Sequence, residues 1–225
     1  QSGLVDLDRA VCDVPGGTTV VIAARPSMGK TAFMSQLAEG VAENSGGDAL
    51  IFSLDQKKDD LPQRTLSSAS GIDSQKIRRA RMTDEDFDRL VETAGAKQEL
   101  RLWIDDKPDR TLSQISACVR LRQRHAKVGA IFVDYLQLVQ PANRSLPREQ
   151  QIAELMRGFH IMARNLDIPV FLLAQLNRQV DGRPDKPPTA LSETPGLRPS
   201  RDAASRVAGC AAWVEAPSTR RAGAI

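Results

Sequence analysis

Three consecutive residues, Gly29, Lys30 and Thr31, have the types and spacing of a phosphate-binding loop. They follow an apolar, β-branched run and precede a segment with helical periodicity. Backbone N–H groups of such a turn and the positive end of the helix dipole attract phosphate. Gly29 would let the backbone approach closely, Lys30 would reach the β- and γ-phosphates of ATP, and Thr31 would ligate Mg²⁺. The predicted nucleotide-binding residues are Ala24, Arg25, Pro26, Ser27, Met28, Gly29, Lys30 and Thr31.

The loop departs from the usual pattern G-x-x-x-x-G-K-[ST] at its first position, where this chain has Ala24 instead of glycine. An alternative interpretation is therefore that Gly29, Lys30 and Thr31 form a polar turn that opens an amphipathic helix. The apolar run before these residues and the helical periodicity after them favour the phosphate loop.

Polar residues that stand directly after other apolar runs complete a candidate ATP hydrolysis site. Asp134 is predicted to be the carboxylate beside Mg²⁺, Asp55 to polarise the attacking water, and Gln175 to contact the γ-phosphate. With Lys30 these are the predicted catalytic residues, and Thr31 and Asp134 are the predicted Mg²⁺ ligands. The alternatives are a turn residue for Asp134, a helix N-cap for Asp55 and a strand cap for Gln175.

Apolar runs alternate with helix-like segments, and this order would bring the polar residues together. Because the apolar runs are continuous, the strands are expected to be buried on both faces, in an α/β fold with a mostly parallel sheet and helices on both faces. Ligands of such sheets bind beyond the carboxyl ends of the strands. Asp105, at another of these ends, is assigned to a loop. The expected strands cover residues 20–24, 49–54, 100–104, 130–134 and 169–174. The expected helices cover residues 32–41, a segment ending near 71, residues 73–98 with Thr83 as an N-cap, residues 111–125 with a capping box, and residues 149–166.

Composition narrows the class of protein. The chain has 225 residues, 41% of them hydrophobic and 26% charged, and its net charge of +3 does not by itself indicate nucleic acid. Its three cysteines and two histidines lack metal-ligand spacing and are expected to be incidental in a reducing compartment. No run approaches the roughly 20 apolar residues of a membrane span. Since the chain begins with Gln1 and lacks a signal-peptide layout, we expect a cytoplasmic domain cut from a longer protein.

Four segments carry a further resemblance, namely residues 23–31, 51–55, 132–138 and 174–178. In content and order they are similar to the motifs of DnaB-type replicative helicases, a family that tolerates alanine at the position of Ala24. The resemblance implies that residues 1–190 form a RecA-like phosphate-loop NTPase domain that uses ATP and Mg²⁺. It also implies a homo-hexameric ring that moves along single-stranded DNA and unwinds duplex DNA, with a primase and a helicase loader as candidate partners.

In that family, loops that face the central channel hold the DNA backbone. The DNA-binding residues that the resemblance implies here are Arg144, Arg148, Arg178, Arg183 and Lys186. Because no aromatic residues are interleaved with them, they suit phosphate contacts better than base stacking. Loop solubility is the alternative. A second basic run is interpreted as a solvated helix face, with nucleic-acid binding as its alternative. This run comprises Arg120, Arg122, Arg124 and Lys127.

Two departures from the family pattern bear on activity. The family's water-activating acid is usually Glu, whereas this chain has the shorter Asp55, which predicts slow hydrolysis. Residues 191–225 form an atypical Ala-, Arg- and Pro-rich tail with one expected strand, around residues 211–214, and no recognisable arginine finger. We interpret this tail as disordered or as the product of an altered reading frame. The alternatives to a helicase motor are therefore a nucleotide-binding module that associates with replication proteins, or another RecA-like ATPase.

Overall fold

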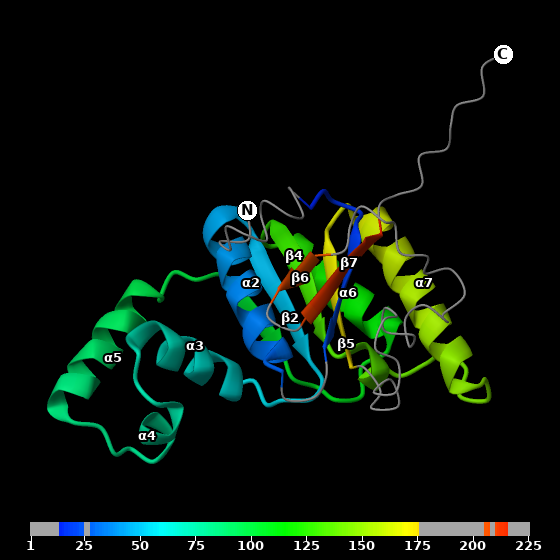
Figure 1. Cartoon of the computed structure of the whole chain (residues 1–225). Helices are drawn as coiled ribbons and strands as arrows, with labels where there is room; N and C mark the ends of the chain where they lie inside the picture. The colour runs from blue at the N-terminus through cyan, green and yellow to red at the C-terminus, as the bar shows by residue number, and fades with distance from the viewer. Residues whose placement is uncertain (1–13, 25–27, 176–204, 208–209, 216–225) are drawn as a thin grey trace.

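The computed structural model describes residues 14–24 and 28–175 in full, and the backbone of residues 205–207 and 210–215. Its strands form one sheet in the order β3-β2-β4-β5-β1-β7-β6 (Figure 1). The strands are β1 (Thr19–Ala24), β2 (Asp48–Ser53), β3 (Leu102–Asp105), β4 (Val128–Asp134), β5 (Val170–Gln175), β6 (Ser205–Val207) and β7 (Cys210–Glu215). Each of the five strands expected from the sequence is present.

The strands β1 to β5 pair in parallel, which confirms the predicted α/β class. The two remaining strands come from the segment predicted to be an atypical tail. β7 pairs with β1 in the antiparallel sense, from Thr19 opposite Glu215 to Ala23 opposite Ala211, and β6 pairs with β7. The strand expected around residues 211–214 is therefore confirmed, and it joins the same sheet as the other elements.

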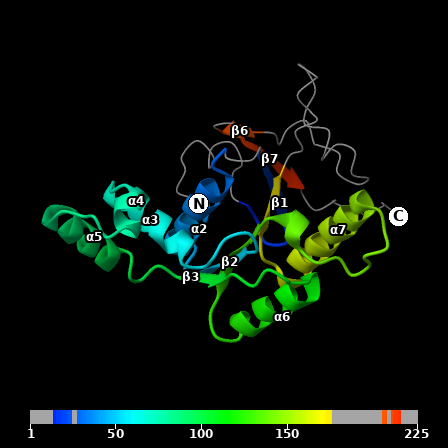
Figure 2. The same cartoon turned by 90° about the horizontal axis from the view of Figure 1, so that it is seen from below.

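Helices cover both faces of the sheet, as the continuous apolar strands predicted. Along β1, Val21 and Ala23 pack in a core cluster with residues of α6 (Leu112–Gln123) and α7 (Arg148–Leu166). The alternate residues Val20 and Ile22 pack in a second cluster with α2 (Lys30–Asn44). Figure 2 shows α2 on one side of the sheet and α6 and α7 on the other. No helix in the described part of the chain is long and apolar enough to cross a membrane.

Three helices stand beside the sheet as a separate group: α3 (Asp60–Ser70), α4 (Ser74–Arg78) and α5 (Asp84–Ala96) (Figure 1). The single helix expected over residues 73–98 is therefore wrong. The chain turns at Ala80, whose φ of 49° lies in the left-handed region, and α5 starts anew where the Thr83 side chain accepts a hydrogen bond from the Asp86 N–H. The predicted N-cap at Thr83 is confirmed, and this cap explains the break.

Two charged residues lie in environments that differ from the predicted ones. Asp105 is the last residue of β3 rather than part of a loop, and its buried carboxylate pairs with Arg110. Arg122, predicted to lie on a solvated face, donates from Nε to Oδ2 of the buried Asp48 at 2.5 Å. In both cases a buried carboxylate requires a cationic partner. Arg122 is distant from Asp48 in the sequence, and no sequence pattern indicates that Arg110 pairs with Asp105.

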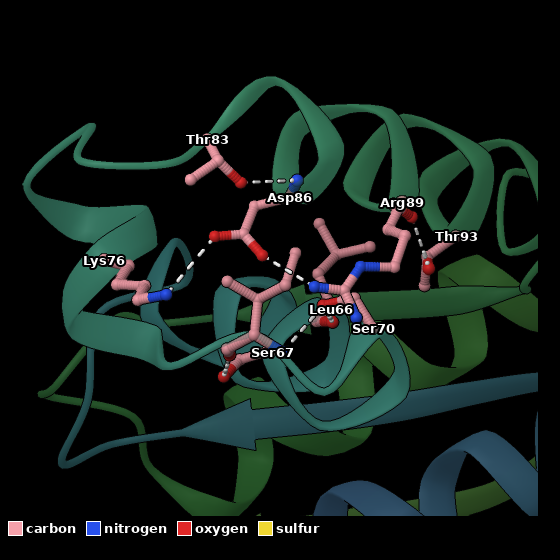
Figure 3. Close-up of polar contacts among 9 residues, drawn as sticks. Leu66, Ser67, Ser70, Lys76, Thr83, Asp86, Arg89 and Thr93 are labelled. Carbon is pink, nitrogen blue, oxygen red and sulfur yellow. Dashed lines mark hydrogen bonds and ion pairs between the residues drawn. The ribbon is translucent and has the colours of Figure 1, made fainter.

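A buried carboxylate also holds the α4–α5 pair together. The Asp86 side chain is 8% exposed and lies 2.6 Å from Arg89 Nη2 and 3.3 Å from Lys76 Nζ (Figure 3). The hydrogen bond from Arg89 lowers the pKa of Asp86, burial opposes this effect, and hydrogen bonds from Lys76 and Thr83 lower the pKa further.

Acid should loosen the α4–α5 pair through Asp86. Because the folded-state pKa is depressed, the carboxylate stabilises this region above its unfolded pKa of about 3.9, and the contribution is lost as the pH falls through the folded-state value. We expect amide-exchange protection in α4 and α5, corrected for intrinsic rates, to fall between pH 6 and pH 3. Asp86→Asn should show low protection at both pH values, whereas Asp88→Asn, at an exposed position of α5, should behave as the parent chain does. Equal protection of the parent chain at both pH values would contradict this role.

Candidate nucleotide-binding site

The candidate phosphate loop connects the end of β1 to the start of α2. Gly29, the residue before α2, has a φ of 78°, in the left-handed region that glycine adopts without strain. Among the residues that the structure describes, none lies within 4 Å of a Cβ added to Gly29, which leaves room beside this backbone for a phosphate group. Met28 is half exposed beside it. The predicted residues Arg25, Pro26 and Ser27 lie outside the described residues.

Two side chains of the first turn of α2 converge on the carboxylate at the end of β4. Lys30 Nζ lies 3.1 Å from Oδ1 of Asp134, and the Thr31 hydroxyl donates to Oδ2 at 2.7 Å. The Asp134 side chain is 1% exposed and that of Lys30 is 13% exposed. The structure thus brings together three of the predicted site residues from segments about a hundred positions apart.

Tyr135, which the sequence interpretation left without a role, lies at the same place. Lys30 Nζ lies 4.3 Å from the centroid of the Tyr135 ring, a cation–π contact. Burial raises the pKa of Tyr135, and the nearby carboxylates of Asp55 and Asp134 raise it further. Lys30 is therefore held between a ring face and a carboxylate.

Asp55 is exposed beyond the end of β2, close enough to Tyr135 to affect its titration. The backbone N–H of Leu54 donates to the Asp134 carbonyl at 2.7 Å, which ties the ends of β2 and β4 together. The N-cap of the next helix, α3, is Asp59. The alternative interpretation of Asp55 as the helix cap is therefore wrong, and an exposed carboxylate at the rim of the site remains.

Gln175 ends β5 directly beside the phosphate loop, since it pairs with Ala24 in the parallel ladder. Its side chain is exposed. Gln137 lies in the short 3₁₀ helix η1 (Leu136–Leu138), and its carboxamide makes two hydrogen bonds with the Gln175 backbone. Sequence reasoning assigned Gln137 no role. Its position just after the strand that carries Asp134 was the signal that could have drawn attention to it.

Two of the candidate DNA-binding residues, Arg144 and Arg148, lie in the described part of the chain, and both make hydrogen bonds within the protein. Arg144 is exposed, and its Nη2 donates to Gln140 Oε1 at 3.0 Å. Arg148 uses its guanidinium within the protein, because Nη1 donates to Gln151 Oε1 at 2.9 Å and Nη2 donates to the Gln137 carbonyl. The remaining candidates, Arg178, Arg183 and Lys186, lie outside the described residues.

The residues present fit a magnesium-nucleotide complex. Mg²⁺ takes oxygen ligands, keeps several waters and is usually held by one or two carboxylates together with substrate phosphates. The Thr31 hydroxyl and the Asp134 carboxylate supply two such oxygens, and they already lie within 2.7 Å of each other. Within the described part of the chain, Oδ1 of Asp134 is buried with no hydrogen-bond partner and lies 3.1 Å from the Lys30 ammonium.

This is the arrangement of a phosphate-loop NTPase: a mostly parallel sheet, a loop and helix after β1, and a buried carboxylate at the end of β4. The comparisons with known proteins agree with this class. The chain belongs to the family of the DnaB-like helicase C-terminal domain, whose model matches residues 1–200. It is 36% identical over 188 residues to the replicative DNA helicase DnaB of Geobacillus stearothermophilus, a match that covers 83% of this chain and 41% of that protein.

Two solved structures are similar to this fold. The ATPase domain of G40P matches with a TM-score of 0.78 and 36% identity, over 84% of this chain and 67% of that chain. A DnaB-like replicative helicase, described with its interactions with primase, matches with the same TM-score and identity over 84% of this chain and 46% of that chain. These matches confirm the predicted RecA-like fold. The chain spans less than half of the Geobacillus relative.

Proposed function

We propose that this chain is the ATPase motor of a replicative DNA helicase, which hydrolyses ATP with Mg²⁺ to move along single-stranded DNA and unwind duplex DNA. The convergence of Lys30 and Thr31 on the buried Asp134 carries the proposal, because this is the set of groups that phosphoryl transfer requires. We also propose a homo-hexamer, a primase and a helicase loader as partners, and a cytoplasmic location.

Each site residue would have a distinct role in ATP hydrolysis. The backbone at Gly29 and the N-terminus of α2 would hold the phosphates, and Lys30 would contact the β- and γ-oxygens. Thr31 and Asp134 would hold Mg²⁺, which neutralises the charge that develops on these oxygens. Asp55 would orient the attacking water, and Gln175 would contact the γ-phosphate. The second candidate function, a nucleotide-binding module with little turnover, is favoured by the short side chain of Asp55 at the exposed rim.

ATP hydrolysis with and without single-stranded DNA tests the proposal, with Lys30→Ala as the decisive variant. Because Lys30 would make a charge-assisted contact with phosphate, its loss should weaken ATP binding by about 10- to 100-fold and remove DNA-stimulated turnover. Lys107→Ala, at an exposed position after β3, is the matched control and should retain both.

Three outcomes distinguish the candidate functions. DNA-stimulated hydrolysis that is lost in Lys30→Ala supports the motor. Tight binding without turnover supports the nucleotide-binding module. Turnover that survives in Lys30→Ala would show that the activity does not come from this site.

A further inference from the structure

Among the strands that the structure describes, none pairs with the last residues of β5 on the β4 side. β4 pairs with β5 from Ile131 opposite Val170 to Val133 opposite Leu172, and the chain then leaves the ladder after Asp134. β1 continues to pair on the other side as far as Gln175. The last residues of β5 thus extend beyond β4, at the edge where the phosphate loop lies.

The carboxamide of Gln137 takes the place of the missing strand. Its Nε2 donates to the Gln175 carbonyl at 3.1 Å, and the Gln175 N–H donates to its Oε1 at 3.3 Å. The side-chain carboxamide here supplies the one donor and one acceptor that two successive peptide groups of a neighbouring strand would supply in a ladder. Both backbone polar groups of Gln175 are therefore bound by this one carboxamide, and its own side chain is left exposed, with Ala24 of β1 opposite it in the ladder.

The backbone carbonyl of Gln137 links this residue to the loop before α7. Its carbonyl accepts from Arg148, whose other terminal nitrogen donates to Gln151. The buried Gln151 side chain donates in turn to the carbonyls of Arg144 and Leu146, at 3.2 and 2.8 Å. A continuous set of hydrogen bonds thus runs from Gln175 through Gln137 and Arg148 to the loop that carries Arg144.

We propose that Gln137 is a positioning residue that holds Gln175 at the nucleotide site and couples it to the Arg144–Arg148 loop. The inference rests on the proposed function, in which Gln175 contacts the γ-phosphate and the loop contacts DNA. Displacement of Arg148 by a DNA phosphate would remove a hydrogen bond from the Gln137 carbonyl and so alter the support of Gln175. In this role Gln137 would act through Gln175 and not by its own contact with nucleotide or DNA.

Gln137→Leu, which keeps the volume and removes both side-chain hydrogen bonds, tests the proposal in the full chain. We expect ATP affinity within about twofold of the parent and DNA-stimulated kcat about tenfold lower, the order expected for two lost neutral hydrogen bonds. Amide exchange at Gln175 should be about tenfold faster, because its N–H loses its acceptor. A dT oligonucleotide should alter this exchange in the parent but not in the variant.

Two further variants separate positioning from a general effect on the fold. Gln137→Glu keeps an acceptor for the Gln175 N–H and should restore slow exchange. Gln123→Leu removes an exposed glutamine carboxamide on α6 that donates to the Leu166 carbonyl at 3.5 Å, and it should leave every measured quantity unchanged.

The outcomes also separate this inference from the proposed function. Exchange and turnover of Gln137→Leu equal to those of the parent would overturn the positioning role. The role would also be overturned if Gln137→Leu lost thermal stability and ATP affinity to the same extent as it lost turnover, since that would indicate a role in folding alone. If the parent chain shows no turnover that depends on Lys30, the proposed function fails, and the exchange at Gln175 alone decides whether Gln137 positions it.

Discussion

Asp134→Asn should lower kcat for ATP hydrolysis by about 10²- to 10³-fold while ATP binding persists. This is the range observed when one preorganised electrostatic group is removed from an active site. Asparagine has nearly the same shape and can still accept the hydrogen bond from Thr31, so the fold at the end of β4 should be kept. The carboxylate charge beside Mg²⁺ is lost, and Lys30 loses the partner that now lies 3.1 Å away. The freed ammonium should hold the phosphates at least as tightly as before.

The measurement is a titration with a fluorescent ATP analogue, followed by phosphate release at saturating ATP. Asp109→Asn makes the same acid-to-amide change at an exposed position after β3 and should leave kcat unchanged. A kcat for Asp134→Asn within about threefold of the parent would exclude Asp134 from the Mg²⁺ role. A loss of ATP binding would mean instead that the substitution disrupts the loop.

Much of this site follows from local sequence. A glycine that must adopt a positive φ, a lysine and a hydroxyl at the start of a helix are adjacent in the chain, and Gly29 has that φ in the structure. Asp134 and Gln175 were found because they end apolar runs, and the edge of a parallel sheet gathers the carboxyl ends of its strands. Tyr135 and Gln137 do not end apolar runs, and their position just after β4 was the one sequence signal that pointed to them. Their roles depend on how the chain turns after β4, and no periodicity of residue types encodes that turn.

The fold was predicted best where the pattern of hydrophobic residues alone determines the type of secondary structure. The five parallel strands and the helices on both faces follow from continuous apolar runs that alternate with periodic segments. The helix expected over residues 73–98 failed because composition favours helix on both sides of Ala80, while a left-handed turn and a new cap at Thr83 divide it. The burial of Asp105 and Asp48 depends on cations at positions 110 and 122, and pairings of this kind appear only once tertiary contacts are known.

The central sheet should be the most sensitive part of the chain to cavity formation. Phe132 of β4 is fully buried, and its ring stacks on that of Phe171 with centroids 4.8 Å apart. Phe132→Ala should lower the free energy of unfolding by about 3–5 kcal/mol, because it removes buried apolar surface and leaves a cavity that rigid neighbouring strands cannot fill. That is a large part of the total of about 5–15 kcal/mol typical of a domain.

Phe87→Ala is the matched control, since Phe87 on α5 is 55% exposed. It should change the free energy of unfolding by less than about 1 kcal/mol. Urea unfolding followed by circular dichroism measures both variants, and equal losses would show that the core is not centred on β4. Because ATP binds the folded chain and not the unfolded chain, nucleotide should stabilise any core variant that keeps the site. Saturation of Phe132→Ala with ATP at about 100 times its Kd should then restore about 2.7 kcal/mol, whereas Phe132→Ala combined with Lys30→Ala should recover much less.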